Sequence, residues 1–163
     1  MRYIYPAAIL MAFGLAGCGT TVVSPAIANK PGVKTAMGQD GYPILVSVHL
    51  TTPTKTTAES RSKCISSQLD DIEGAPIIVG SAVQASGKSS FYFARVGANE
   101  AFRYTVRVDG QSSSSYTFER LRYFGSGTQG GPIMASQYWS PEKLVEELET
   151  ITDRIDACAR TYG

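Results

Sequence analysis

The sequence contains a single histidine, His49, and only three cysteines among its 163 residues. With one imidazole available, metal centres built from several histidines and catalytic histidine pairs are excluded. Acidic and basic residues nearly balance, and the formal net charge is +1. A nucleic-acid-binding protein needs a clear basic excess, so we expect no nucleic-acid partner. The sequence also lacks an uninterrupted apolar run of the ~20 residues that a transmembrane helix requires.

The N-terminal residues do carry a short apolar segment with the features of a secretion signal. The basic residue Arg2 precedes an apolar stretch over residues 4–16, and small residues follow just before Cys18. The segment Leu15-Ala16-Gly17-Cys18 resembles the lipobox of bacterial lipoproteins, in which an aliphatic and two small residues precede an invariant cysteine. The resemblance implies that residues 1–17 are a cleaved signal peptide and that Cys18 becomes the lipidated first residue of the mature chain. By the same resemblance, Gly19 after the cysteine implies attachment to the outer membrane, and we expect the periplasmic face.

Lipidation of Cys18 leaves Cys64 and Cys158 as the remaining thiols. The cell envelope is an oxidising compartment, where two such thiols are expected to pair. We therefore predict a disulfide between Cys64 and Cys158.

Residues 18–40 contain several prolines and glycines, no aromatic residue and no sustained hydrophobic period. We interpret them as a flexible tether between the membrane and the folded part. The remaining residues, 41–163, are then a single domain, which is large enough to bury a core of its own.

The apolar pattern of the domain predicts strands in its middle and a helix on either side of them. Residues 43–51 alternate and are rich in β-branched side chains, which predicts a strand, whereas residues 54–72 recur at helical spacing. Four strand-like runs follow, over 77–84, 89–96, 101–108 and 115–124, with breaks at 86–88, 97–99 and 109–112. Short breaks predict hairpins and a sequential antiparallel meander. Residues 133–139 are a candidate further edge strand.

The C-terminal segment predicts the longest helix. Ser140 is a candidate N-cap and Pro141 fits the first helical position. Steps of four and three residues then predict one apolar stripe, formed by Leu144, Leu148, Ile151, Ile155, Cys158 and Tyr162.

The predicted order is β-α-β-β-β-β-(β)-α, an α+β fold in which two helices cover one face of an antiparallel sheet of five or six strands. This order resembles the helix-grip domains, a superfamily of lipid- and steroid-binding proteins. In them a long C-terminal helix lies across a curved antiparallel sheet and encloses a cavity. The resemblance implies a role as a carrier or binding module for a lipid or another apolar ligand.

Basic residues are concentrated in the predicted meander. Between residues 88 and 124 six basic residues stand against three acidic ones, whereas acids outnumber bases in residues 141–163. If the helices cover one face of the sheet, we expect an arginine-rich stripe on the other, formed by Arg103, Arg107, Arg120 and Arg122. Two interpretations remain open: an ordinary solvated sheet face, or a contact surface on which arginine recognises an anionic partner.

For catalysis the sequence offers no constellation of residues. His49 falls on the polar face of the first predicted strand without an evident partner, so we interpret it as an exposed strand histidine. We therefore expect a non-enzymatic, lipid-anchored envelope protein without cofactor or metal. It would act as an accessory or assembly subunit that binds an envelope protein, an anionic glycan or a lipid headgroup. The alternatives are the carrier and an envelope hydrolase or hydrolase inhibitor.

Overall fold

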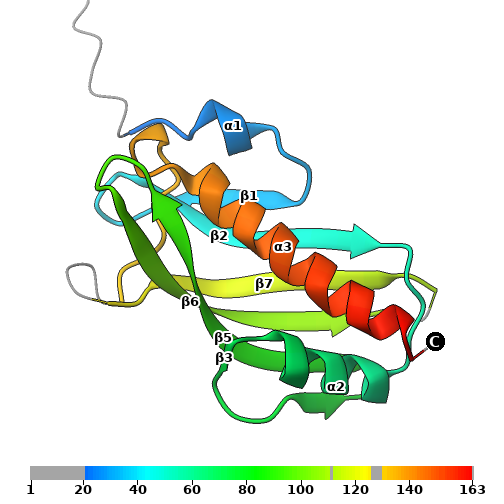
Figure 1. The fold of residues 1–163 in the computed structure, drawn as a ribbon. Helices are drawn as coiled ribbons and strands as arrows, with labels where there is room; N and C mark the ends of the chain where they lie inside the picture. The colour runs from blue at the N-terminus through cyan, green and yellow to red at the C-terminus, as the bar shows by residue number, and fades with distance from the viewer. Residues whose placement is uncertain (1–20, 111, 126–129, 163) are drawn as a thin grey trace, which may run out of the picture.

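The computed structural model describes residues 21–110, 112–125 and 130–162. They form an α+β fold with one antiparallel sheet of seven strands in this part of the chain, in the order β1-β2-β7-β6-β5-β3, with β4 also paired to β5. A long helix, α3 (Pro141–Arg160), crosses one face of the sheet, and α2 (Ala58–Gln68) lies beside its C-terminal half (Figure 1). This confirms the predicted fold class.

The central strands form the meander that the hairpin pattern predicted. β5 (Ala82–Phe93) pairs with β6 (Ala98–Asp109), and β6 pairs with β7 (Ser114–Tyr123). The first predicted strand, β2 (Pro43–Thr52), pairs along one edge with β7, which lies far from it in sequence. β2 thereby joins the meander through a long-range contact.

Two predicted boundaries in the middle of the chain are wrong. The break predicted at residues 86–88 lies inside β5, and the turn lies instead at Gly80, which separates β4 (Ile77–Val79) from β5. The helix predicted over residues 54–72 ends at Gln68, and β3 (Asp71–Ile72) then pairs with β5. Leu69, the C-cap, is extended and buries its side chain in the core, which takes the chain out of the helix.

The N-terminal segment of the described chain is folded, in contrast to the predicted tether over residues 18–40. It forms a helical turn, α1 (Pro25–Ala28), and an edge strand, β1 (Val33–Met37), which pairs with β2. Ile27 is 1% exposed and belongs to the core, so this segment is part of the domain. The tether prediction is therefore wrong for these residues.

Residues 133–139, a candidate edge strand, contain only isolated bridges and the 3-10 helix η1 (Gln137–Trp139). Met134 bridges to Ile44, and the backbone N–H of Leu45 donates to the carbonyl of Ile133 over 2.8 Å. This segment covers the start of β2 without extending the sheet as a strand.

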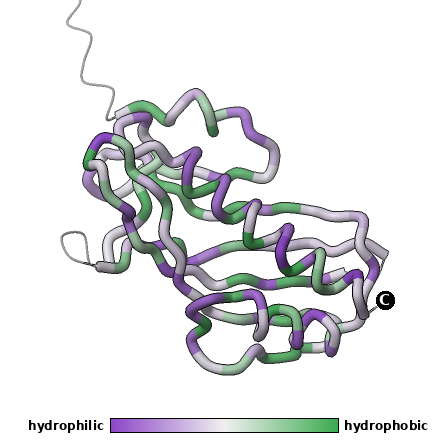
Figure 2. Tube along the Cα trace, in the orientation of Figure 1, coloured by the Kyte–Doolittle hydropathy of each residue, from purple (hydrophilic) through white to green (hydrophobic). Residues whose placement is uncertain are grey.

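The core fills the space between α3 and the sheet. Residues of α3 from the predicted stripe are buried to 1% exposure or less, namely Leu144, Leu148, Ile151 and Ile155. They belong to the same hydrophobic cluster as the aromatic residues of the sheet. Along α3, hydrophobic residues alternate with hydrophilic ones (Figure 2). Tyr162 is an exception to the predicted stripe, since it lies beyond the end of α3 and is 57% exposed.

Candidate binding surface

The sheet face that the helices leave open carries the predicted arginines of β6. Phe102, Tyr104 and the apolar residues that alternate with the arginines are buried towards the helices. Arg103 and Arg107 point the other way, with side chains that are 45% and 50% exposed. The period of two along this strand therefore predicted the orientation of both side chains correctly.

A bulge in β7 determines where the other two arginines lie. Thr105 pairs with Glu119, but two residues earlier in β6 Arg103 pairs with Arg122, so β7 contains one extra residue. Arg120 takes up the extra length with a φ of 53°, in the left-handed region. As a result Glu119 and Arg120 are both exposed before Leu121 returns to the core. Bulges of this kind redirect side chains and are common next to functional sites.

These strands enclose a shallow depression of about 410 Å³ on the open face. Arg103, Arg120 and Arg122 line it, together with Glu73, which follows β3. Ser86 and Thr105, whose hydroxyls lie 3.2 Å apart, also line it. The bulge and the turn after β3 thus bring three arginines, one carboxylate and two hydroxyls to one depression.

Two of the four predicted arginines have acidic neighbours. Glu73 lies 3.7 Å from Arg103, and Asp109 lies 3.3 Å from Arg107. A hydrogen bond from the backbone N–H of Gly110, followed by one from the Ser81 hydroxyl, lowers the pKa of Asp109 below its ordinary value. Asp109 therefore stays charged and partly neutralises Arg107 near neutral pH.

Arg120 and Arg122 form no salt bridge with a carboxylate of the described residues. Arg122 donates to the carbonyl of Gly130 over 2.7 Å. Phe124 lies near the same edge, and the Arg103 guanidinium and the Lys88 ammonium stand 4.7 Å and 4.5 Å from the centre of its ring. The two predicted arginines without a carboxylate partner among the described residues thus lie at the bulge and directly after it.

His49 is exposed on β2, and its Nδ1 lies 3.2 Å from the hydroxyl of Thr117 on β7. No group of three potential metal ligands gathers in the part of the chain that the structure describes.

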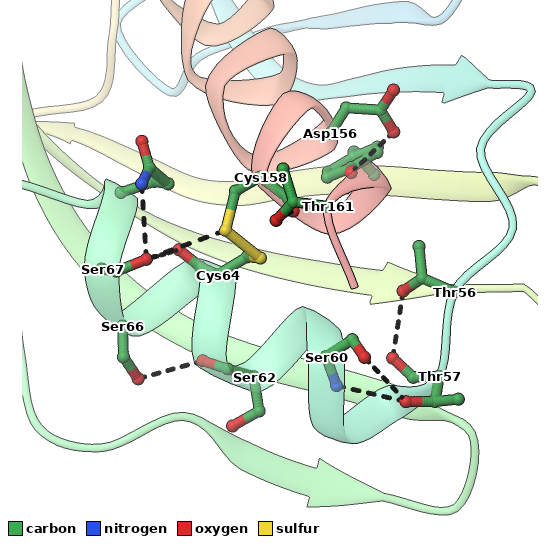
Figure 3. Close-up of a disulfide and its surroundings, with 12 residues drawn as sticks. Thr56, Thr57, Ser60, Ser62, Cys64, Ser66, Ser67, Asp156, Cys158 and Thr161 are labelled. Atoms are coloured by element: carbon green, nitrogen blue, oxygen red, sulfur yellow. Dashed lines mark hydrogen bonds between the residues drawn. A yellow bond between two sulfur atoms is a disulfide. The ribbon is translucent and has the colours of Figure 1, made fainter. Parts of the chain in front are cut away.

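The cysteine pair is formed as predicted. Cys64 on α2 and Cys158 on α3 are joined by a disulfide with Cα atoms 5.7 Å apart (Figure 3). Ser67 lies beside the bond and donates to the backbone carbonyl of Cys64 over 3.2 Å. Cys18, the predicted lipid attachment site, lies outside the described residues.

A buried polar cluster around Asp156 of α3 escaped the sequence analysis. Asp156 is 3% exposed and accepts hydrogen bonds from the hydroxyls of Thr52 (2.6 Å), Thr54 (2.5 Å) and Tyr116 (3.3 Å). Burial, followed by the charge of Asp156, raises the pKa of Tyr116 above its ordinary value, so the phenol keeps the proton that it donates. The cluster joins the end of α3 to β2 and β7 and has a structural role.

Comparison with known proteins leaves the family open. No protein-family model and no curated protein matches the sequence. A solved structure of a DUF4468 family protein from Bacteroides ovatus matches with a TM-score of 0.41 and 11% sequence identity, over 86% of this chain and 90% of that chain. A likeness at this level assigns neither a family nor an activity.

Proposed function

We propose that this chain is a lipid-anchored, non-enzymatic protein of the bacterial cell envelope that binds an anionic partner through the open face of its sheet. The observation that carries the proposal is the bulge at Arg120. A non-glycine residue in the left-handed region costs free energy, and such strain is commonly retained where function requires it. Here it adds a third arginine to a depression already lined by Arg103 and Arg122.

Arginine suits this role because its planar guanidinium presents paired N–H groups to carboxylate or phosphate oxygens. Arg120 and Arg122 are exposed and lie in a depression wide enough for such a group. The partner would be an acidic envelope protein or the phosphates of a lipid headgroup, and the protein would act as an accessory subunit.

The carrier function implied by the helix-grip resemblance has less support. A carrier needs an apolar space between the sheet and the C-terminal helix. In this chain Leu144, Leu148 and Ile155 of α3 are fully buried and belong to the same core cluster as the residues of the sheet. This close packing favours a surface contact over an enclosed ligand.

The lipid anchor rests on the lipobox resemblance at Cys18. Among the described helices none is both long and apolar enough to span a bilayer. Two or more acyl chains on one cysteine would give stable membrane attachment.

The two parts of the proposal are tested separately, the lipid anchor first. The full-length protein and its Cys18→Ser variant are expressed in bacteria with labelled palmitate, and membrane fractions are collected. We expect loss of label and of membrane association in the variant. Unchanged labelling would contradict lipidation at Cys18 but would leave the binding surface to be judged separately.

For the binding surface, an Arg120→Glu/Arg122→Glu variant is tested against lipopolysaccharide micelles and against poly-glutamate. We expect affinity for at least one of these to fall about tenfold or more, because two charges are reversed at one site. The matched control is Lys63→Glu/Lys143→Glu, which reverses two exposed charges on the helices. Equal losses in both variants, or no binding of either probe by the unaltered protein, would contradict the proposal.

A further inference from the structure

A second polar site lies on the helix-covered side of the molecule, at the N-terminal end of α2. Its central residue is Arg61, which is 1% exposed and is the largest of the fully buried side chains. One terminal nitrogen donates to the carbonyl of Ser81 over 3.3 Å and the other donates to the carbonyl of Gly110. The Nε–H has no hydrogen-bond partner among the described residues.

The partners of Arg61 leave its charge poorly compensated. A guanidinium has five N–H donors, and two backbone carbonyls satisfy only part of them. Arg61 forms no salt bridge with a carboxylate of the described residues. Burying a charge without an opposite charge is costly, so an arginine in this position is well suited to receive an anion.

Arg61 lines an open depression of about 650 Å³. Lys55, Thr57 and Ala58 form another side of it, and Tyr162 of the C-terminal segment lies at the same depression. Thr57 caps α2 by accepting from the backbone N–H of Ser60 over 3.2 Å, while the N–H groups of the two preceding positions have no acceptor within the helix. The positive end of the helix dipole therefore acts on this depression together with two basic side chains.

Two acidic groups nearby, Asp109 and Asp156, are engaged elsewhere. Asp109 accepts from Ser81 and from the backbone N–H of Gly110 and pairs with Arg107. Asp156 accepts three hydroxyls and pairs with Arg160 at 3.4 Å. Glu59, in the first turn of α2, is exposed.

From these contacts we infer that the depression at the start of α2 binds a small organic anion through its carboxylate or phosphate group. The anion accepts from the first N–H groups of α2, the uncompensated charge of Arg61, which lines the depression, attracts it, and Lys55 supplies a further positive charge at the exposed side. The apolar part of the ligand lies against Ala58 and the ring of Tyr162. This site is separate from the arginines of the open sheet face and does not depend on the function proposed for them.

The test uses the full-length protein, labelled for NMR and titrated with benzoate, phenyl phosphate and the uncharged benzyl alcohol at constant ionic strength. We expect saturable shifts of the backbone amides of Thr57, Ala58 and Ser81 with at least one anion, and none with benzyl alcohol. The tighter of the two anions identifies the preferred group. Shifts that occur equally with benzyl alcohol, or that centre on Arg120 and Arg122, would overturn the inference.

Variants then separate binding from folding. Arg61 is buried, so its replacement can unfold the domain, and Lys55→Glu is the primary variant because Lys55 is exposed. We expect Lys55→Glu to raise the dissociation constant about fivefold or more, since it replaces an attraction by a repulsion. Lys63→Glu makes the same change on an exposed position of α2 outside the depression and should have less than a twofold effect. Equal effects of both variants would show attraction to overall charge and would refute a site at Arg61.

Discussion

Replacing Arg120 by glycine should stabilise the protein and weaken its binding at the same time. The left-handed conformation at φ 53° costs an L-residue about 1–2 kcal/mol, which glycine does not incur. Glycine also makes the unfolded chain more flexible, which lowers the free energy of unfolding by about 0.4–1 kcal/mol. The net expectation is a gain of about 0.5–1 kcal/mol in the free energy of unfolding, or roughly 1–4 °C in Tm for a domain of this size.

Urea unfolding of the full-length chain measures this gain, and binding to lipopolysaccharide micelles or poly-glutamate is measured in parallel. Ser140→Gly is the matched control, because Ser140 has a φ of 48° and its side chain makes no capping hydrogen bond. It should gain similar stability with no change in binding. If Arg120→Gly destabilises the protein while Ser140→Gly stabilises it, the Arg120 side chain supports the fold, and the argument from strain to function fails.

Two further predictions concern the helix-covered side. Cys64→Ser/Cys158→Ser should lower the free energy of unfolding by about 2–4 kcal/mol, since the bond closes a loop between residues 94 apart, and urea unfolding checks this. Thiol titration of the unfolded, unreduced protein should find neither cysteine reactive, and two reactive thiols would refute the disulfide. Asp156→Asn should cost about 2 kcal/mol, because three hydroxyls lose a charged acceptor, whereas Asp153→Asn at an exposed position should cost less than ~0.5 kcal/mol.

The elements that could be predicted are those in which the apolar period is long and uninterrupted. The period of β6 predicted both the burial of Tyr104 and the exposure of Arg103, and the steps along α3 predicted its buried face from Leu144 to Ile155. Pairing of the two remaining cysteines followed from the expected compartment alone, and the structure contains that disulfide.

Glycine caused the main errors in the predicted element boundaries. In the sequence, a glycine that close packing requires cannot be distinguished from one that a turn requires. Gly87 lies inside β5, where an added Cβ would come within 2.9 Å of the Tyr104 hydroxyl. Gly32 lies in a turn with a φ of 80°, and there a Cβ would overlap a backbone atom, the carbonyl oxygen of His49 on β2. Pro25 likewise opens α1 in the segment that composition predicted as a tether. Only the three-dimensional contacts of these segments with neighbouring strands distinguish them from loops.

The candidate site was predictable in part, for a related reason. The alternation of apolar and polar residues predicted that Arg103 and Arg107 lie on the open face. It does not reveal the bulge, which depends on how β7 pairs with β6. The sequence analysis singled out neither Arg61 nor Asp156, although Asp156 follows Thr152 by four residues and so lies at the edge of the buried face of α3. Their burial depends on hydroxyl and carbonyl partners that are distant in sequence.

The folded N-terminal segment limits how far the protein could reach from a membrane. Val23 bridges to Ser136, and Lys30 pairs with Glu149 of α3 at 2.8 Å, so the chain is fixed to the domain from Val23 onwards. If Cys18 carries the lipid, the five residues to Val23 span at most ~17 Å when fully extended. This connecting segment is shorter than the domain itself, which is roughly 35–40 Å across. The domain would then stay next to the bilayer, and its binding partner would have to lie in the same layer.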